Sequence, residues 1–268
     1  MSAVNYRLAG DVAILEIANP PVNALSLAVR EGLMEGLERA AADPAVVGVV
    51  IAGAGGAFPA GADINEIASG LALKAPMILD VQARMEAMRK PLVAALEGNA
   101  LGGGFELALT CHWRVATPAT RVGLPEVKLG LIPGAGGTQR FTRLAGPEAA
   151  LDAITSGAQL PAARAHALGL VDALAADAVT AAAGLARQAV REGWPLRLAS
   201  DVDERIREVS GAPFSAFRQK LATRARGQLA PWKIIDCIEA ACTRAKAEAF
   251  RFERDCFIEC RDSPQRRA

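Results

Sequence analysis

Two glutamates of this 268-residue chain lie in apolar surroundings, which makes them the first candidates for proton-transfer chemistry. Glu106 stands between Phe105 and Leu107 in the first turn of an expected helix, and Glu126 follows the segment 122–125 (VGLP). Two carboxylates that face one apolar pocket raise each other's pKa, so that one can hold a proton while the other acts as a base. Taken singly, Glu106 is equally well explained as a charge that complements the helix dipole, and Glu126 as an exposed loop residue. A separation of twenty residues leaves both interpretations open.

A run of three glycines, 102–104, comes directly before the helix that carries Glu106. The first N–H groups of a helix have no partner inside the helix and lie at its positive end. Because glycine lacks a Cβ atom, the backbone at such a run can approach a ligand oxygen closely. The run therefore favours a site in which backbone N–H groups bind an oxygen atom of a ligand.

Two other glycine-rich segments contain only part of a nucleotide-binding motif. The segment 56–63 (GAFPAGAD) has the spacing of a phosphate loop, but Ala62 and Asp63 replace the lysine and the serine or threonine that such a loop requires. The segment 134–136 (GAG) begins a dinucleotide fingerprint, but Gln139 stands where its last glycine belongs. The sequence therefore predicts neither a nucleoside triphosphate site nor an NAD site in this chain.

The sequence gives no support for a metal, nucleic-acid or membrane partner. Four of the five cysteines, Cys237, Cys242, Cys256 and Cys260, form no CxxC pair and have no histidine nearby, so no metal site is expected. The uncharged stretch 44–62 contains two prolines and five glycines, so it is interpreted as a buried strand and a loop. A net charge of +1 with 4% aromatic residues favours no nucleic acid. Free thiols and the lack of a secretion signal predict a cytoplasmic location.

The elements that must hold these groups in place alternate between short Val/Ile/Leu runs and longer helical patterns. Strands are expected at 12–17, 46–52, 92–96 and 113–116. Helices are expected at 27–42 after the cap Ser26, at 76–90, at 104–111, and after Gly137 and Pro147. This alternation predicts an α/β fold with largely parallel strands.

A change of composition near residue 195 divides the chain into two parts. Residues 1–195 carry 15 Lys/Arg and 18 Asp/Glu, a net charge of −3, whereas residues 196–268 carry 15 and 11, a net charge of +4. Strand patterns end at the same point, and helical patterns continue alone. We expect a catalytic α/β core in 1–195, followed by a helical extension in 196–268.

Three longer segments closely resemble the enoyl-CoA hydratase/isomerase superfamily, also known as the crotonase superfamily. They are 57–67 (AFPAGADINEI), 98–107 (GNALGGGFEL) and 123–140 (GLPEVKLGLIPGAGGTQR). The resemblance continues in order from about Val12 to Val190. It implies a ClpP/crotonase-like spiral of ββα units and an acyl-CoA thioester as the substrate.

The resemblance also implies roles for residues of this sequence. The backbone N–H groups of Ala62 and Gly103 correspond to the family's oxyanion hole, which stabilises the enolate of the thioester. Glu106 corresponds to the residue that orients and deprotonates the attacking water, and Glu126 to the one that exchanges a proton at C2. The implied reaction is hydration of 2-trans-enoyl-CoA to 3-hydroxyacyl-CoA in fatty-acid β-oxidation, with some isomerisation of a C3 double bond to C2. No metal or redox cofactor is implied, because CoA is part of the substrate.

The same resemblance places CoA along the turn 22–25 and the loop 60–64, largely on backbone groups. The residues expected to contact CoA or the substrate are Ala24, Ala60, Asp63, Ile64 and Gly104. The C-terminal arginines are better explained as a solvated helix face than as phosphate ligands. His112 and His166 match no catalytic position of the family and are expected to be structural.

Two other functions remain open from the sequence. A dedicated enoyl-CoA isomerase would keep the same oxyanion hole and lack efficient hydration. A non-catalytic protein with the crotonase fold would use its basic C-terminal part to bind RNA or a protein partner. The presence of both glutamates and of the glycine run argues against the non-catalytic alternative.

The end of the chain, 253–268 (ERDCFIECRDSPQRRA), resembles the segment that joins the two parts of bifunctional enoyl-CoA hydratase/3-hydroxyacyl-CoA dehydrogenases. A helix that bears Phe250, Phe252 and Phe257 has too much apolar surface to stand free, so it must pack on the chain. We therefore expect a monomeric hydratase part of a longer protein, whose further C-terminal part would be able to carry a peroxisomal signal. The alternative is a complete small hydratase with an unusual tail, for which the family implies a trimer or hexamer.

Overall fold

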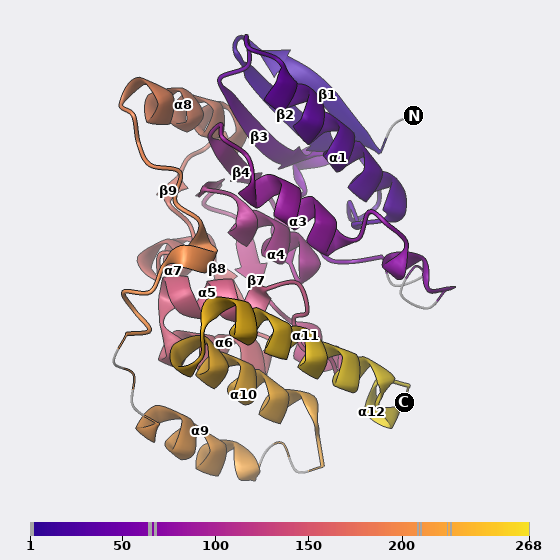
Figure 1. Cartoon of the computed structure of the whole chain (residues 1–268), viewed down its shortest axis with the longest axis vertical. Coiled ribbons are helices and arrows are strands. Elements are labelled where there is room, and N and C mark those ends of the chain that lie inside the picture. Colours follow the sequence, from indigo (N-terminus) through magenta and orange to yellow (C-terminus); the bar gives the residue numbers. More distant parts are fainter. Residues whose placement is uncertain are drawn as a thin grey trace.

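Six strands form the larger of two sheets in the computed structural model of this chain, in the order β1-β2-β3-β4-β6-β9 (Figure 1). The structure describes residues 3–63, 66, 69–207, 209, 211–223, 225 and 227–267. The edge strand β1 runs antiparallel to β2, and the other neighbours pair in parallel. The strands are β1 (Val4–Ala9), β2 (Val12–Ile17), β3 (Gly48–Gly53), β4 (Leu92–Leu96), β6 (Trp113–Ala116) and β9 (Ala173–Leu174). The prediction of an α/β fold with largely parallel strands is confirmed.

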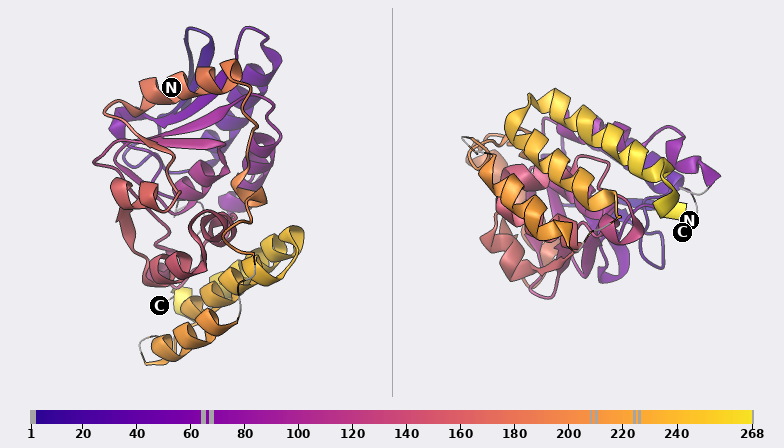
Figure 2. Two further views of the ribbon diagram at one scale, coloured as in Figure 1. Left: turned by 90° about the vertical axis from the view of Figure 1, so that its left-hand side faces the viewer. Right: turned by 90° about the horizontal axis from the view of Figure 1, so that it is seen from below.

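Helices cover both faces of this sheet, which explains why its central strands consist almost entirely of Val, Ile, Leu and Ala. Successive side chains of a strand point to opposite faces, so Leu15 packs toward one helical layer and Ile14 toward the other. The second layer is the alanine-rich side of α8 (Ala178–Arg191), which lies across the sheet (Figure 2, left). The helices of the first layer are α1 (Leu27–Ala42), α3 (Ile78–Glu86) and α4 (Gly103–Thr110).

A smaller sheet of three short strands holds two loops together. β5 (Asn99–Leu101) pairs in parallel with β7 (Arg121–Gly123), and β8 (Gln159–Pro161) pairs antiparallel with β7. Because β5 and β7 are parallel, their carboxyl ends lie side by side, with Leu101 opposite Gly123. The sheet thereby brings the start of α4 next to the segment that follows β7.

Helices and turns make up the described residues after Pro195, with no strand among them. Helix α10 packs on α5 and α6, and α11 packs alongside α10 and contacts α5 (Figure 2, right). Phe252 and Phe257 of α11 pack against the main apolar core, which confirms that this helix lies against the rest of the chain. The helices not yet given bounds are α5 (Gly137–Ala145), α6 (Pro147–Ser156), α7 (Ala162–Ala167), α9 (Ala212–Ala222), α10 (Ala230–Thr243), α11 (Lys246–Asp262) and α12 (Pro264–Arg267).

The expected elements are present, and three have different bounds, including the helix expected at 104–111, which covers Gly103–Thr110. The helix expected at 76–90 covers only Ile78–Glu86, because Asp80 accepts a hydrogen bond from the Met77 N–H group and starts the helix there. The strand expected from residue 46 begins at Gly48, the residue that pairs with Val12 at the start of β2. Short 3₁₀ turns lie at Ala54–Gly56, Leu71–Leu73, Glu126–Leu129 and Ala199–Asp201. No helix in the described part of the chain is both long and apolar enough to span a membrane.

Candidate active site

A cavity of about 380 Å³ lies between the start of α4, the segment after β7 and helix α11. Glu106 and Glu126 both line this cavity, so the structure brings together the two carboxylates whose relation the sequence left open. Apolar side chains form much of the remaining wall, among them Leu25, Leu73, Met77, Ile78, Leu131 and Ile132. The two carboxyl groups therefore share one low-dielectric space.

The smaller sheet places Glu126 at the cavity. Glu126 is the third residue after β7 and begins a 3₁₀ turn, while Gly102 follows β5 directly. The Gly102 N–H group donates to the Gly123 carbonyl at 2.9 Å, which continues the ladder between the two strands. Gly102 has a φ of +53°, and a methyl group added there would lie 3.1 Å from the Glu126 Oε1 atom. Glycine is favoured at this position because a residue with a side chain would be strained at this positive φ, and because the carboxylate passes close to the backbone.

Glu106 is held from the opposite side by the backbone at the start of α5. Its Oε1 atom accepts hydrogen bonds from the N–H groups of Ala135 and Gly137, both at 2.8 Å. Both bonds use Oε1, which leaves Oε2 available to a water molecule or a substrate. A methyl group added to Gly137 would lie 2.6 Å from Oε1, so glycine allows the close approach.

Burial raises the pKa of both carboxyl groups above the ordinary value of 4.5. For Glu106, the N–H groups of Ala135 and Gly137 and two nearby arginines oppose this rise by stabilising the charged form. For Glu126, the negative charge of Glu106 adds to the effect of burial and holds the pKa well above 4.5. The Glu126 Oε2 atom is buried without a hydrogen-bond partner in the described structure. The arrangement thus favours an ionised Glu106 beside a protonated Glu126.

Replacing Glu126 by glutamine is expected to stabilise the fold increasingly as the pH rises. A carboxyl group whose pKa is raised by folding binds more protons in the native state, so the free energy of unfolding falls as the pH rises from 4.5 toward the native pKa. Glutamine is uncharged in both the native and the unfolded state, so the variant does not lose stability in this way. Thermal unfolding should show a stability gain over the wild type that grows by at least about 1 kcal/mol between about pH 5 and about pH 7. A gain that stays constant over this range, or the same trend in the exposed control Glu148→Gln, would contradict the expectation.

The two backbone N–H groups for which the family resemblance implies an oxyanion hole also lie at the cavity. Ala62 and Gly103 both line it, and a methyl group added to Gly103 would lie 3.5 Å from the Ala62 nitrogen. No described residue accepts a hydrogen bond from either N–H group. The neighbouring Gly104 packs so closely on Pro59 that an added methyl group would collide with the Pro59 carbonyl oxygen. This contact fixes the distance between the start of α4 and the loop that carries Ala62.

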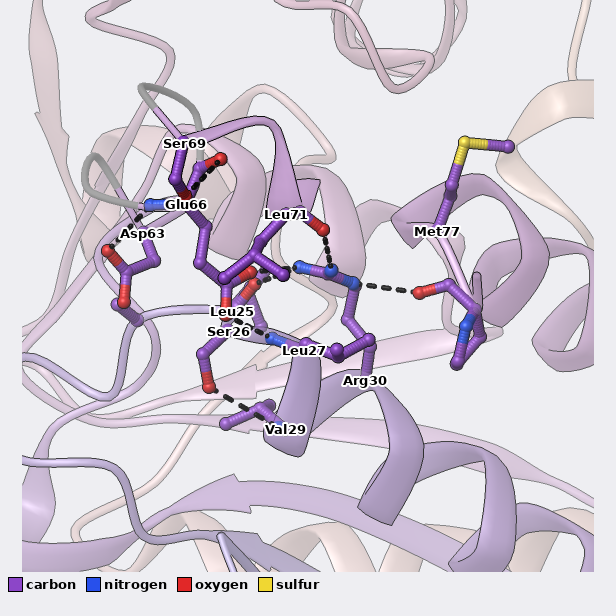
Figure 3. Close-up of polar contacts among 12 residues, drawn as sticks. Leu25, Ser26, Leu27, Val29, Arg30, Asp63, Glu66, Ser69, Leu71 and Met77 are labelled. Atoms are coloured by element: carbon purple, nitrogen blue, oxygen red, sulfur yellow. Dashed lines mark hydrogen bonds and ion pairs between the residues drawn. The ribbon is translucent and has the colours of Figure 1, made fainter. Parts of the chain in front are cut away.

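A buried arginine ties that loop to α1 (Figure 3). Arg30 is 3% exposed, and its Nε and Nη2 atoms donate to the carbonyls of Pro76 (2.8 Å) and Leu71 (3.0 Å). Its Nη1 atom donates to the Leu25 carbonyl at 3.0 Å and forms an ion pair with Glu66 at 2.9 Å. One guanidinium therefore joins four points of the chain, which lysine is unable to do.

The partner of Arg30 strengthens the same connection. Glu66 also accepts a hydrogen bond from the Leu27 N–H group at 2.7 Å, at the start of α1. The Leu25 N–H group donates to the Gly61 carbonyl at 3.0 Å, next to Ala62. The Ala62 N–H group is thus held by a network that was not recognised in the sequence.

We expect Arg30→Lys to lower the free energy of unfolding by about 3 kcal/mol, because one ammonium group is unable to reach all of the buried carbonyls and the Glu66 carboxylate, and the acceptors left over stay unsatisfied. Urea denaturation measures this loss, and limited proteolysis should show faster cleavage within 69–77. The control is Arg39→Lys, on the exposed side of the same helix. Equal stability and equal cleavage in the two variants would show that Arg30 does not hold the loop.

The other predicted site residues differ in whether they line the cavity. Ala60 lines it, whereas Ala24, Asp63 and Gly104 do not belong to its described lining. Ile64 lies outside the described residues. Their contacts with CoA stay predictions.

Both histidines make structural hydrogen bonds. His112 accepts a hydrogen bond from the Leu92 N–H group at 2.9 Å, and burial lowers its pKa to about 4. His166 lies 2.9 Å from the Val171 carbonyl through Nδ1. The five cysteines are free thiols, and within the described ranges no cluster of three or more His, Cys, Asp or Glu side chains is arranged to hold a metal ion.

A third buried glutamate was missed in the sequence. Glu253 of α11 is 1% exposed, and its Oε1 atom accepts a hydrogen bond from the Gly136 N–H group at 2.6 Å. Its Oε2 atom accepts from the N–H group of Thr138 at 2.9 Å and from the Thr138 hydroxyl. A signal was present, because the buried residues of α11 form a helical stripe in which Glu253 is the one charged member: Ala249, Glu253, Cys256 and Cys260.

Comparison with known proteins identifies the family to which the chain belongs. The family model of the enoyl-CoA hydratase/isomerase family matches residues 7–199. The chain belongs to this family. Its fold is accordingly the crotonase fold, as the resemblance implied.

Relatives of this enoyl-CoA hydratase/isomerase family member include bifunctional enzymes. The peroxisomal bifunctional enzyme of Danio rerio is 44% identical over 86% of this chain and 32% of its own length, and that of Homo sapiens is 38% identical over 98% and 36%. The chain therefore spans about a third of the length of these relatives. A carnitinyl-CoA hydratase from Mycobacterium avium, solved as a crystal structure, is 31% identical with a TM-score of 0.70 over 100% of this chain and 93% of its own. The predicted resemblance to bifunctional enzymes is confirmed.

Proposed function

We propose that this chain hydrates 2-trans-enoyl-CoA thioesters to 3-hydroxyacyl-CoA, without a metal or a redox cofactor. The observation that carries the proposal is the meeting of four groups at one cavity: two buried carboxyl groups with different environments and two backbone N–H groups that have no acceptor among the described residues. The family description and the names of the relatives support an acyl-CoA thioester as the substrate.

Each group has a role in the addition of water across the C2=C3 bond. Glu106 Oε2 takes a proton from the water whose oxygen bonds to C3, while Ala135 and Gly137 hold Oε1 in place. The electron pair of the double bond moves toward the thioester oxygen, which the N–H groups of Ala62 and Gly103 stabilise. Protonated Glu126 then donates its proton to C2. Transfer of a proton from Glu106 back to Glu126 through solvent restores the starting state.

Isomerisation of a 3-enoyl-CoA to the 2-enoyl isomer is a second candidate activity. In this reaction the ionised form of Glu126 would take a proton from C2 and return it to C4, and no described residue competes for that proton because the buried Oε2 atom has no partner in the described structure. This reaction requires the same oxyanion hole but no attacking water, and it therefore depends less on Glu106 than hydration does.

Hydration is tested by adding the purified chain to crotonyl-CoA and following the loss of the ultraviolet absorbance of the conjugated thioester. We expect formation of 3-hydroxybutyryl-CoA, with no effect of a chelator and no reduction of NAD⁺ by the product. A wild-type chain that binds crotonyl-CoA without turning it over would overturn the proposal in favour of a binding protein. Conversion of a 3-enoyl-CoA alone would make the chain a dedicated isomerase.

The oligomeric state and the cellular location stay predictions. Several relatives are named as peroxisomal or glyoxysomal enzymes, which supports an organelle as the alternative to the cytoplasm. Size-exclusion chromatography with light scattering distinguishes the expected monomer from a trimer or hexamer.

A further inference from the structure

Four consecutive N–H groups at the start of α5 are shared alternately between two buried glutamates. Those of Ala135 and Gly137 donate to Glu106, and those of Gly136 and Thr138 donate to Glu253. The two carboxylates thus lie on opposite sides of one short backbone segment. Glu106 belongs to α4 and faces the cavity, whereas Glu253 belongs to α11 and is not among the described residues that line it.

Helix α11 packs closely against this segment and against Gly134, the residue before it. A methyl group added to Gly134 would collide with the Phe257 ring, and one added to Gly136 would lie 2.8 Å from the Phe250 ring. Arg254, the residue after Glu253, donates to the Gly134 carbonyl at 3.4 Å. The segment therefore has no space to shift toward α11, and the only polar acceptors that α11 offers its N–H groups are the Glu253 oxygens.

Burial and the neighbouring charged and polar groups shift the pKa of Glu253. Burial and the negative charge of Glu106 raise its pKa to about 7, while Thr138, the Gly136 N–H group and Arg140 oppose the rise. Burying the Glu253 carboxyl group costs free energy, and the hydrogen bonds that it accepts offset this cost. Those bonds are the ones that fix the segment.

We propose that Glu253 is a positioning residue for hydration, because it fixes the backbone segment 135–138 whose other N–H groups orient the Glu106 carboxylate. The inference rests on the proposed role of Glu106 in hydration. Glu253 touches neither the substrate nor the water. It acts through the N–H groups of Ala135 and Gly137, which set the direction in which Glu106 Oε2 meets the water.

The main test variant is Glu253→Gln, which keeps the size of the side chain but replaces one acceptor oxygen by an NH₂ group. That NH₂ group would face an N–H donor of Gly136 or Thr138, so one hydrogen bond is lost and the segment must move. Glu253→Asp is the second variant, because it keeps the charge and both acceptors but shortens their reach. The matched control is Glu248→Gln, an exposed glutamate of the same helix.

Steady-state hydration of crotonyl-CoA should separate positioning from a general loss of structure. We expect Glu253→Gln to lower kcat by at least about tenfold while KM changes by less than about threefold, since misplacement of a reacting group affects the chemical step. Rates are referred to the folded fraction, measured by thermal unfolding of the same samples. An unchanged kcat in folded Glu253→Gln, or in folded Glu253→Asp where the former does not fold, overturns the proposal.

A double-substitution cycle tests whether Glu253 acts through Glu106. In a Glu106→Gln background the orientation of residue 106 no longer matters for proton removal, so adding Glu253→Gln should lower the residual rate by less than about threefold. A further loss as large as that in the wild-type background would show an effect independent of Glu106 and would also overturn the proposal.

Amide hydrogen exchange provides a readout that needs no turnover. Glu253→Gln should accelerate exchange of the Ala135 and Gly137 N–H groups at least about tenfold relative to Glu248→Gln, with little change in α8. A wild-type chain without hydratase activity would refute the proposed function alone, because the exchange result then still decides whether Glu253 fixes the segment. Unchanged exchange refutes the inference even in an active enzyme.

Discussion

Glu106→Gln and Glu126→Gln should each lower the turnover number for hydration of crotonyl-CoA by at least about 10²-fold, the lower range for loss of a general acid or base. Glutamine fills the same volume in both places, but its amide is unable to accept or donate the required proton. KM should change far less, because the backbone N–H groups of Ala62 and Gly103 still bind the thioester. Initial rates from the ultraviolet absorbance of the thioester measure both quantities.

The exposed Glu148→Gln serves as the control for these two variants, since it makes the same chemical change at a residue outside the described lining of the cavity. A near wild-type hydration rate in either active-site variant would show that the residue has no proton-transfer role. Isomerisation of a 3-enoyl-CoA should fall less in Glu106→Gln than hydration does, because no water attacks in that reaction. Equal loss of both activities would place Glu106 in the isomerisation step as well.

Gly103→Ala should fold normally and lose at least about 10²-fold in kcat/KM, because blocking the space of the thioester oxygen should cost at least as much as the loss of one oxyanion-hole donor. The added methyl group would meet Leu25 at 3.6 Å and the Ala62 nitrogen at 3.5 Å, both ordinary packing distances. It would therefore cause little strain, yet it would occupy the space beside the Ala62 N–H group in which the thioester oxygen must lie.

The control for this prediction is Gly184→Ala in α8, where an added methyl group meets no atom within 4 Å. Thermal unfolding and the hydration assay on both variants separate an effect on the site from an effect on folding. A fully active Gly103→Ala would mean that the thioester oxygen does not bind between these two N–H groups.

Local patterns predicted the elements whose signals are complete within a short stretch of sequence. The helix Leu27–Ala42 has its cap at Ser26 and an apolar face at helical spacing, and strands such as Leu92–Leu96 are short buried runs bounded by a proline or a turn. The edge strand Val4–Ala9 was missed because most of its side chains are exposed or half-buried. The three-residue strands of the smaller sheet were missed because pairing between distant segments, not local sequence, makes them strands.

In the candidate site too, the local sequence predicted some residues, while others depend on contacts between distant segments. The glycine run and the flanking apolar residues indicated Glu106, but only the pairing of β5 with β7 places Glu126 at the same cavity. Arg30 and Glu253 were missed because each acts through partners far along the chain, 36 residues away for the Arg30–Glu66 ion pair and 115 for the Glu253–Thr138 hydrogen bond. A charged residue within a buried helical stripe is the one local sign of such a partner.

Because Glu253 lies in α11, it is synthesised after the other residues of the site. A ribosome adds residues from the amino end, so Ala62, Gly103, Glu106 and Glu126 leave it while α11 is still to be made. Until residues 246–262 emerge and fold back, the N–H groups of Gly136 and Thr138 lack the acceptors that they have in the finished structure. The nascent chain thus contains both proposed proton-transfer groups and the segment 135–138 well before it contains the helix that fixes this segment, so the proposed hydration would require α11 to have folded back.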